Sequence, residues 1–226
     1  IYCLMKKIFT YLFLFYFLST FSQKTKSVYP SFKNKSFKDL LINDDWRILI
    51  KTEGFLNFDK TKDIAIVLES KDSIFEKRIE NQPRKNIGRI LLVLINDKVL
   101  IQNNTFLARG DEGGMSPYIE PELEINNNQL KIYYQYLRSN ISYFFECKRK
   151  NLKLTKAKSN YVQSATGNYE FMKYDFINKL LHIETGNISE DGKIKNKIPI
   201  KLKNGLKKLS ELKEMYQWEV LKDRYL

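Results

Sequence analysis

Short apolar segments separated by Asn, Asp and Gly turns recur at intervals of about ten residues, and this spacing constrains the fold most strongly. In the clearest case Glu122–Ile125 alternates polar and apolar residues, asparagines at 126–128 favour left-handed turn angles, and Leu130–Leu137 follows. Strands joined by such short turns pair antiparallel. The pattern predicts a mainly β fold (α+β at most), with antiparallel sheets built from successive hairpins.

β-Branched and aromatic residues with period-2 alternation mark the other expected strands. These are Trp46–Lys51, Asp63–Leu68, Arg89–Ile95, Val99–Ile101, Ile141–Lys148, Asn151–Lys156, Tyr169–Phe176, Lys179–Thr185 and Lys193–Lys201. Arg89–Ile95 is the most apolar of them, which indicates a central strand. The charged segment Lys71–Asn86 contains Pro83 and is expected to be a long solvated loop or a short helix.

Only Leu206–Met215 shows helical spacing, with leucines at 206, 209 and 212 and Ser210 available as a cap. We therefore expect one short helix near the C-terminus. A closing strand over Tyr216–Leu221, which carries Trp218, should follow it.

The segment Met5–Ser22 has the layout of a secretory signal peptide: two lysines, an apolar run over Ile8–Leu18, then small and polar residues. The run of 11 residues is short for a helix that spans a bilayer, which needs about 20. We expect residues 1–22 to be a signal peptide, with translation starting at Met5 and cleavage near Gln23. A polar leader over 23–39 and a single mainly β domain over 40–226 should follow. An uncleaved N-terminal anchor is the alternative. Cleavage would leave a periplasmic or secreted protein without a stable membrane span.

The formal net charge of +13 suits an anionic partner, such as nucleic acid, a lipid headgroup surface or an acidic glycan. However, the lysines are scattered, and arginine, which binds phosphate in a bidentate manner, is rare. We therefore expect no nucleic-acid partner, and an unidentified protein or glycan of the cell envelope in its place.

Cys147 is the only cysteine after the predicted signal, so no internal disulfide can form. Both Cys147 and the single histidine, His182, lie in strand-like segments. A Cys–His nucleophilic dyad is one interpretation, and a buried inert thiol is the favoured one.

The segment 54–63 places oxygen-bearing side chains at Asn57, Asp59 and Asp63 before an apolar strand. A calcium loop spaces its ligands in this alternating way around a hard cation. Here Phe55 stands where the first carboxylate would lie and Lys60 where the turn glycine would lie. Calcium is thus the only cofactor considered, and the alternative is a tight turn in which the polar side chains bind the backbone.

With the following strand, this loop resembles the G-D-L-N-x-D-G-x-x-D-x-x-x-V pattern of exported bacterial single-domain proteins related to VCBS/FG-GAP-type repeats. An apolar strand at Arg89–Ile95, a glycine-containing acidic loop at 110–114 and an aromatic strand at 142–145 extend the resemblance over Trp46–Lys150. It implies a secreted or periplasmic β-rich domain and brings no activity with it.

The loop 109–115 is the likeliest ligand site by composition, because Arg109, Asp111 and Glu112 stand beside three glycines. Its alternative is a plain solvent-exposed connection. Glu120, Glu122 and Glu124 alternate along a strand, and the favoured interpretation is a solvated face. Paired carboxylates drawn from Asp111, Glu112, Glu120 and Glu122 would suit an envelope polysaccharide hydrolase.

Six aromatic residues on two neighbouring strands form either an aromatic platform for a sugar or base, or part of the core. They are Tyr133, Tyr134, Tyr136, Tyr143, Phe144 and Phe145. No phosphate loop, zinc-spaced Cys/His set or nucleophile elbow occurs in the sequence. The leading hypothesis is therefore a non-catalytic binding or interaction domain, with the hydrolase and a calcium-stabilised structural domain as alternatives.

Overall fold

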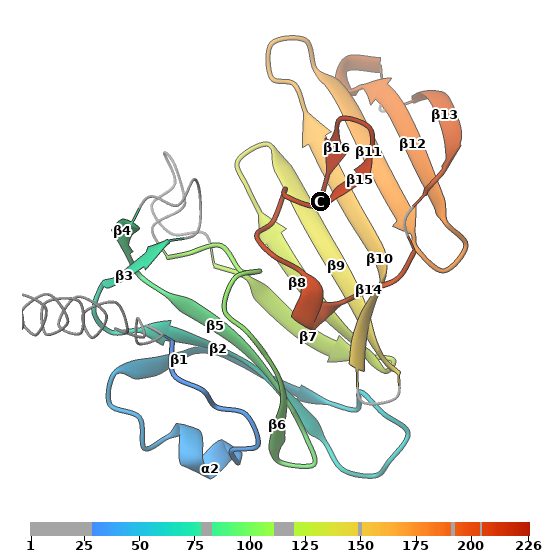
Figure 1. Cartoon of the computed structure of the whole chain (residues 1–226). Coiled ribbons are helices and arrows are strands. Elements are labelled where there is room, and N and C mark those ends of the chain that lie inside the picture. Colours follow the sequence, from blue (N-terminus) through green and yellow to red (C-terminus); the bar gives the residue numbers. More distant parts are fainter. Residues whose placement is uncertain (1–28, 78–82, 111–119, 149–150, 191–192, 204) are drawn as a thin grey trace, which may run out of the picture. The chain divides into compact units, whose positions relative to one another are not determined.

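The computed structural model describes residues 29–77, 83–110, 120–148, 151–190, 193–203 and 205–226 (Figure 1). The predicted signal peptide, Asp111, Glu112 and the turn at Asp191-Gly192 lie outside the described residues. The fold is mainly β and antiparallel, as the turn spacing predicts.

Two larger sheets make up the compact unit Ser31–Leu226. The first has the order β1-β2-β5-β6, with β1 at Trp46–Gly54, β2 at Asp63–Ser70, β5 at Arg89–Ile95 and β6 at Lys98–Asn103. The second is eight-stranded and has the order β13-β12-β11-β10-β9-β8-β7, with β14 added beside β10. Its strands are β7 (Glu122–Asn126), β8 (Gln129–Gln135), β9 (Ser139–Lys148), β10 (Asn151–Val162), β11 (Asn168–Asp175), β12 (Leu180–Asn187), β13 (Ile194–Lys201) and β14 (Lys207–Lys208).

The hairpin turns have the backbone that the asparagines predicted. Asn127 and Asn128 have φ values of 50° and 58°, and Asn96 and Asp97 have φ values of 50° and 57°. Asparagine and aspartate tolerate these left-handed angles better than most residues, which fixes each two-residue turn and the register of its strands.

Two of the smaller predictions are wrong. The segment Lys71–Asn86 is neither a loop nor a helix throughout, because it contains the paired strands β3 (Ile74–Lys77) and β4 (Pro83–Asn86). In place of a helix over 206–215, the chain forms β14 and a 3₁₀ turn, η2, at Leu209–Glu211. The closing strand is β15 (Glu219–Leu221), which pairs with β16 (Arg224–Tyr225), and a further 3₁₀ turn, η1, lies at Ile188–Glu190.

The described α-helix, α2 at Phe37–Leu40, spans the end of the predicted polar leader at residue 39. The Ser36 hydroxyl accepts a hydrogen bond from the backbone N–H of Asp39, and the Asp39 carboxylate accepts one from the N–H of Ser36. Phe32 is buried, and the N–H of Asn34 donates to the carbonyl of Val99 in β6. The segment 31–39 therefore packs as part of the compact unit Ser31–Leu226.

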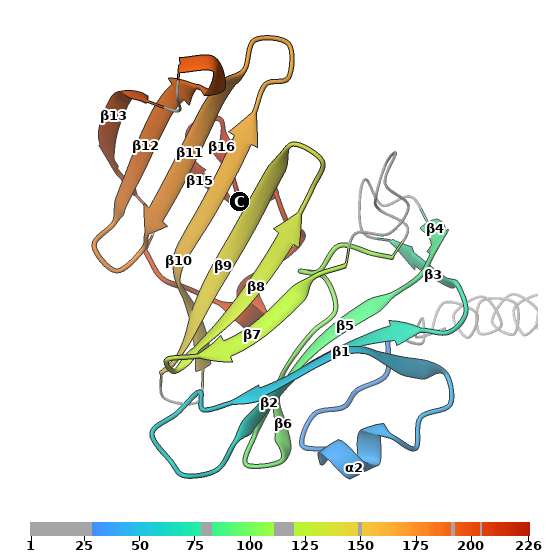
Figure 2. The same ribbon diagram turned by 180° about the vertical axis from the view of Figure 1, so that it is seen from behind.

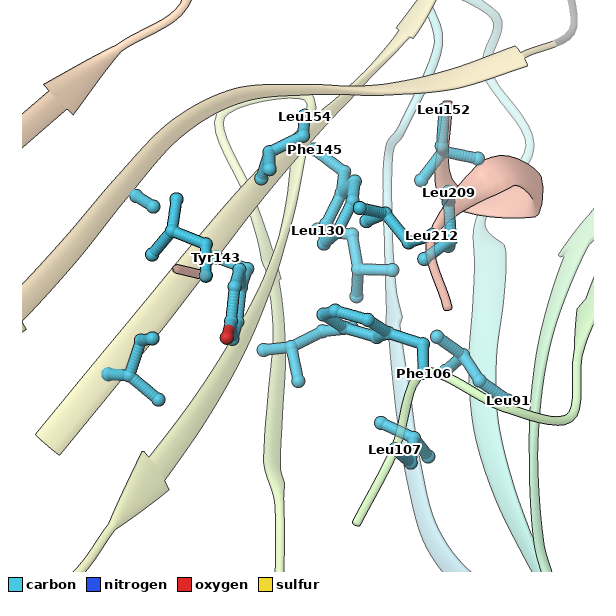
Figure 3. Close-up of a cluster of buried hydrophobic side chains, with 14 of the residues drawn as sticks. Leu91, Phe106, Leu107, Leu130, Tyr143, Phe145, Leu152, Leu154, Leu209 and Leu212 are labelled. Carbon is cyan, nitrogen blue, oxygen red and sulfur yellow. The ribbon is translucent and has the colours of Figure 1, made fainter. Parts of the chain in front are cut away.

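One hydrophobic core joins both sheets and the C-terminal segment (Figure 3). Phe106, which follows β6, is 2% exposed, and its ring centroid lies 4.9 Å from that of Tyr143 and 6.0 Å from that of Phe145. The Asn103 side-chain amide donates to the carbonyl oxygens of Leu209 and Leu212, at 2.7 and 3.0 Å. This pair of hydrogen bonds fixes η2 against the first sheet, and Leu209 and Leu212 enter the core beside β9 and β10 (Figure 3).

Candidate functional site

Alternation along β8 and β9 divides the six candidate aromatic residues between two faces of the eight-stranded sheet. Tyr134, Tyr143 and Phe145 are buried in the core, and Tyr136 is partly buried and stacked on Tyr134. Burial raises the pKa of the Tyr143 hydroxyl well above its ordinary value, as expected for a core tyrosine. Only Tyr133 and Phe144 are therefore still candidates for an aromatic platform, because they lie on the face opposite the core and are partly exposed.

We call the side of this sheet that carries Tyr133 and Phe144 the outer face, and the side that packs into the core the inner face. Figure 2 views the sheet from the side opposite the C-terminal segment, which packs on the inner face. In this view no described element lies over β8, β9 and β10. The outer face is thus the broad surface that the described chain leaves open to a ligand.

A hollow of about 390 Å³ lies on the outer face over β7 to β10. Aromatic, amide, hydroxyl, carboxylate and ammonium groups all line it, and its lining residues are Glu124, Asn126, Asn127, Gln129, Lys131, Ser142, Phe144 and Lys158. The Asn127–Asn128 turn that joins β7 to β8 lies at one end of the hollow, so the same residues that fix the register also shape the site.

Phe144 is the aromatic centre of this hollow, and two lysines flank it. The Lys158 ammonium lies 5.5 Å from the centroid of the Phe144 ring, within the range of a cation–π contact. Lys131 is directly opposite Phe144 in the register of β8 and β9. Its ammonium lies 3.2 Å from the Glu124 carboxylate and 5.5 Å from the centroid of the Tyr133 ring. Lys131 is therefore neutralised by a neighbour, whereas Lys158 makes no ion pair within the part of the chain that the structure describes.

The polar rim is held in place by side-chain hydrogen bonds. The Gln129 amide donates to Glu146 at 3.0 Å, and the Lys148 ammonium lies 3.0 Å from the same carboxylate. Burial alone would raise the pKa of Glu146, but the hydrogen bonds from Lys148 and Gln129 outweigh it and hold that pKa below its ordinary value. Glu146 thus stays ionised near neutral pH and orients Gln129, which leaves the Gln129 carbonyl oxygen as an acceptor beside the hollow.

The described part of the predicted ligand loop at 109–115, Arg109 and Gly110, makes contacts within the fold. Arg109 is buried and forms an ion pair with buried Glu76 of β3. The adjacent Gly110 N–H donates to the carbonyl of Ile87 at 3.4 Å. Arg109 therefore joins the β3–β4 hairpin to the chain after β6, while its predicted partners Asp111 and Glu112 lie outside the described residues.

The predicted metal ligands at 57, 59 and 63 all accept backbone hydrogen bonds. Asn57 Oδ1 accepts from the N–H of Asp59, and Asp59 Oδ1 accepts from the N–H of Thr61, both at 2.9 Å. Asp63 is buried, its Oδ2 accepts from the N–H of Leu56 at 2.8 Å, and its Oδ1 has no hydrogen-bond partner among the residues that the structure describes. Burial outweighs the backbone hydrogen bonds and raises the pKa of Asp63. Among the residues described, no group of three or more His, Cys, Asp or Glu side chains is arranged to hold a metal ion.

The remaining candidates do not assemble a catalytic group in the described chain. Glu120, Glu122 and Glu124 are exposed, as the solvated-face interpretation predicted. Cys147 lies on the inner face and packs against the core, while His182 alternates with buried Leu181 and Ile183 and lies on the outer face of β12. Two strands and the thickness of the sheet separate these side chains, which excludes the Cys147–His182 dyad.

Sequence reasoning missed Lys131, Ser142, Gln129 and Lys158 as members of the site. For Lys131, Ser142 and Gln129 the available signal was the alternation along β8 and β9, because residues two or four apart from Tyr133 and Phe144 share their face. No helix in the described ranges has the length and apolar character needed to cross a membrane. No protein-family model, curated protein or solved structure matches the chain.

Proposed function

We propose that this chain is a secreted or periplasmic, non-catalytic binding domain whose ligand is a glycan of the cell envelope, held in the hollow over Phe144. The location rests on the signal-peptide pattern of Met5–Ser22. The ligand class rests on the chemistry of the outer face.

The observation that carries the proposal is the partly exposed Phe144 ring, surrounded by hydrogen-bonding side chains. A sugar ring has an apolar C–H face, which packs on an aromatic ring, and an edge of hydroxyl groups, which need donors and acceptors. Here the Gln129 and Asn126 amides, the Ser142 hydroxyl and the Lys158 ammonium supply such groups around the ring. The volume of about 390 Å³ falls within the range of small-ligand sites, about 300–1,000 Å³.

A flat protein partner fits this surface less well than a glycan does. Protein interfaces are built around large apolar anchors with few charged residues at their centre. The hollow instead combines one aromatic ring with two lysines and a carboxylate.

The proposal is tested by calorimetric titration of the full chain with soluble envelope polysaccharide and peptidoglycan fragments. Phe144→Leu keeps an apolar side chain but removes the aromatic face, and Phe58→Leu is the matched control, since Phe58 is 96% exposed in the β1–β2 loop. We expect Phe144→Leu to weaken binding by about tenfold, because leucine offers no flat aromatic face and the loss of one stacked ring is worth about 1–3 kcal/mol. The control should bind like the unmodified chain.

Equal binding by the two variants, or no binding by the unmodified chain, would refute the proposal. Release of reducing sugar ends during the same incubation would instead support the hydrolase alternative and would contradict a non-catalytic role.

A further inference from the structure

The outer face extends well beyond the hollow. The register of β9, β10 and β11 places Phe144 on a diagonal line with one residue of β10 and one residue of β11. Phe144 of β9 pairs with Lys156 of β10, and Lys158, two residues further along β10, pairs with Lys173 of β11. Phe171, two residues before Lys173, pairs with Asn160. From each strand to the next, the line therefore shifts by two residues along the strand, which is the spacing between side chains on one face. We call the line Phe144–Lys158–Phe171 the aromatic diagonal.

Both ends of the aromatic diagonal carry a partly exposed aromatic ring with an ammonium group against it. The Lys158 ammonium lies 5.5 Å from the Phe144 centroid, and the Lys173 ammonium lies 4.7 Å from the Phe171 centroid. Neighbouring strands are about 4.8 Å apart and residues along a strand about 3.3 Å, so the Cα atoms of Phe144 and Phe171 are separated by about 16 Å. That distance corresponds to roughly three to four linked sugar units.

At the centre of the aromatic diagonal two lysines repel each other, and an anionic ligand would reduce this repulsion. Lys158 and Lys173 are directly opposite each other on adjacent strands, and like charges in this position destabilise a sheet. Lys173 is neutralised by Glu184, at 3.3 Å, but Glu184 is shared with Lys197, also at 3.3 Å. Lys158 has no carboxylate within ion-pair distance in the described ranges. The positive charge of Lys158 therefore remains uncompensated beside the Phe144 ring, on the strand between Phe144 and Phe171.

We propose that the outer face binds an extended acidic glycan along the aromatic diagonal. One sugar unit packs on Phe144, another packs on Phe171, and a carboxylate or phosphate group of the unit between them binds Lys158. This inference rests on the proposed function and extends it, because it makes the ligand an internal stretch of a linear acidic polymer. The side-chain set favours a glycan over single-stranded nucleic acid, because Glu124 lines the hollow and no arginine lies on the aromatic diagonal.

Chain length and charge are the variables that test this inference. The probes are oligogalacturonates of two to eight units, which carry carboxylates, and mannosyl-phosphate oligomers of matched length, in which phosphodiesters join the sugar rings. Cello-oligosaccharides serve as the neutral series. We expect affinity for at least one acidic series to rise up to about four units and then to level off, and to fall as salt is added.

Two variants assign the effect to the aromatic diagonal. Phe171→Leu should weaken binding of the acidic hexamer by about tenfold and leave the dimer unchanged, since the loss of one stacked ring is worth about that factor. Lys158→Gln should weaken binding of the acidic hexamer by about tenfold and weaken the neutral series much less, because the introduced amide still forms hydrogen bonds but carries no charge. The matched controls, Phe58→Leu and Lys60→Gln, change the same residue types in the exposed β1–β2 loop and should have no effect.

The outcomes separate this inference from the proposed function. If dimers and hexamers bind equally, or if Phe171→Leu has no effect while Phe144→Leu still weakens binding, the extended site is refuted and the glycan hollow stands. If acidic and neutral series bind alike, the anionic requirement is refuted. If no glycan of any series binds, the proposed function fails as well. Tighter binding of a single-stranded oligothymidylate than of every acidic glycan would assign the face to nucleic acid and would overturn both.

Discussion

Arg109 offers a direct test of whether a residue predicted to bind a ligand is structural instead. Its guanidinium and the Glu76 carboxylate form an ion pair in which both side chains are 4% exposed. Removing one member of a buried ion pair costs about 3–5 kcal/mol, because the other charge stays buried and loses this contact. We therefore expect Arg109→Gln to lower the free energy of unfolding by about 3–5 kcal/mol, which lowers the melting temperature by about 6–20 °C for a chain of this size.

The paired change sharpens this prediction. Arg109→Met combined with Glu76→Met removes both charges and fills the space with apolar side chains, so it should cost less than either single change. An exposed ion pair provides the control: Lys208 and Glu211 are 44% and 49% exposed, and Lys208→Gln should cost less than about 1 kcal/mol.

Urea unfolding followed by tryptophan fluorescence measures each of these variants, because Trp46 is buried at the start of β1 and Trp218 stacks on Phe176 at 5.0 Å between ring centroids. A change below 1 kcal/mol for Arg109→Gln, together with a loss of glycan binding, would refute the structural role and restore the ligand-loop hypothesis.

Three further predictions follow from other parts of the fold. A Cβ at Gly54 would lie 2.7 Å from the backbone oxygen of Ile125, so Gly54→Ala should cost about 1–3 kcal/mol in urea unfolding, whereas Gly205→Ala, whose nearest contact is 3.6 Å, should cost almost nothing. Burial would raise the pKa of Glu184, but hydrogen bonds from lysines of β13 and β11 outweigh it and lower this pKa below the ordinary 4.5. The ion pairs of Glu184 therefore stabilise the fold above pH 4.5. This stabilisation is lost as the pH falls through the lowered pKa. The stability difference between the unmodified chain and Glu184→Gln should shrink between about pH 6 and pH 3, and a constant difference would contradict this. The oxygens of the 55–62 loop already accept backbone hydrogen bonds, so melting temperatures in calcium and in chelator should agree, and a rise of several degrees with calcium would instead establish a calcium site.

Local patterns predict most of this fold because each hairpin is specified within a few residues. The β7–β8 hairpin needs only the alternation of Glu122–Ile125 and the asparagines at 127 and 128, whose positive φ angles close the turn. The prediction of a helix over 206–215 is wrong, and the reason is also local. Leucines spaced by three match the 3₁₀ period better than the α-helical one, and the chain forms a 3₁₀ turn at Leu209–Glu211.

The proposed binding surface depends on a feature that alternation cannot predict. Leu152 and Leu154 face the core, so strict alternation along β10 would place Lys156 and Lys158 in the core as well. A register shift between Leu154 and Lys156 adds one residue, Thr155, and turns both lysines to the outer face. Because a shift of one residue exchanges the two faces, Lys158 was not recognisable as a site residue from its position in the sequence. The burial of Arg109 was equally hidden, since Glu76 lies 33 residues away along the chain.

The central claim, that the outer face around Phe144 is the ligand site, is tested most directly by amide chemical-shift mapping. The full chain, labelled with ¹⁵N, is titrated with the glycan that binds best in the length series. We predict that the largest shift changes fall on Gln129, Ser142, Phe144 and Lys158, in strands β8, β9 and β10. Changes centred on Arg109–Gly110 or on the 55–62 loop, with the outer face unaffected, would contradict the claim.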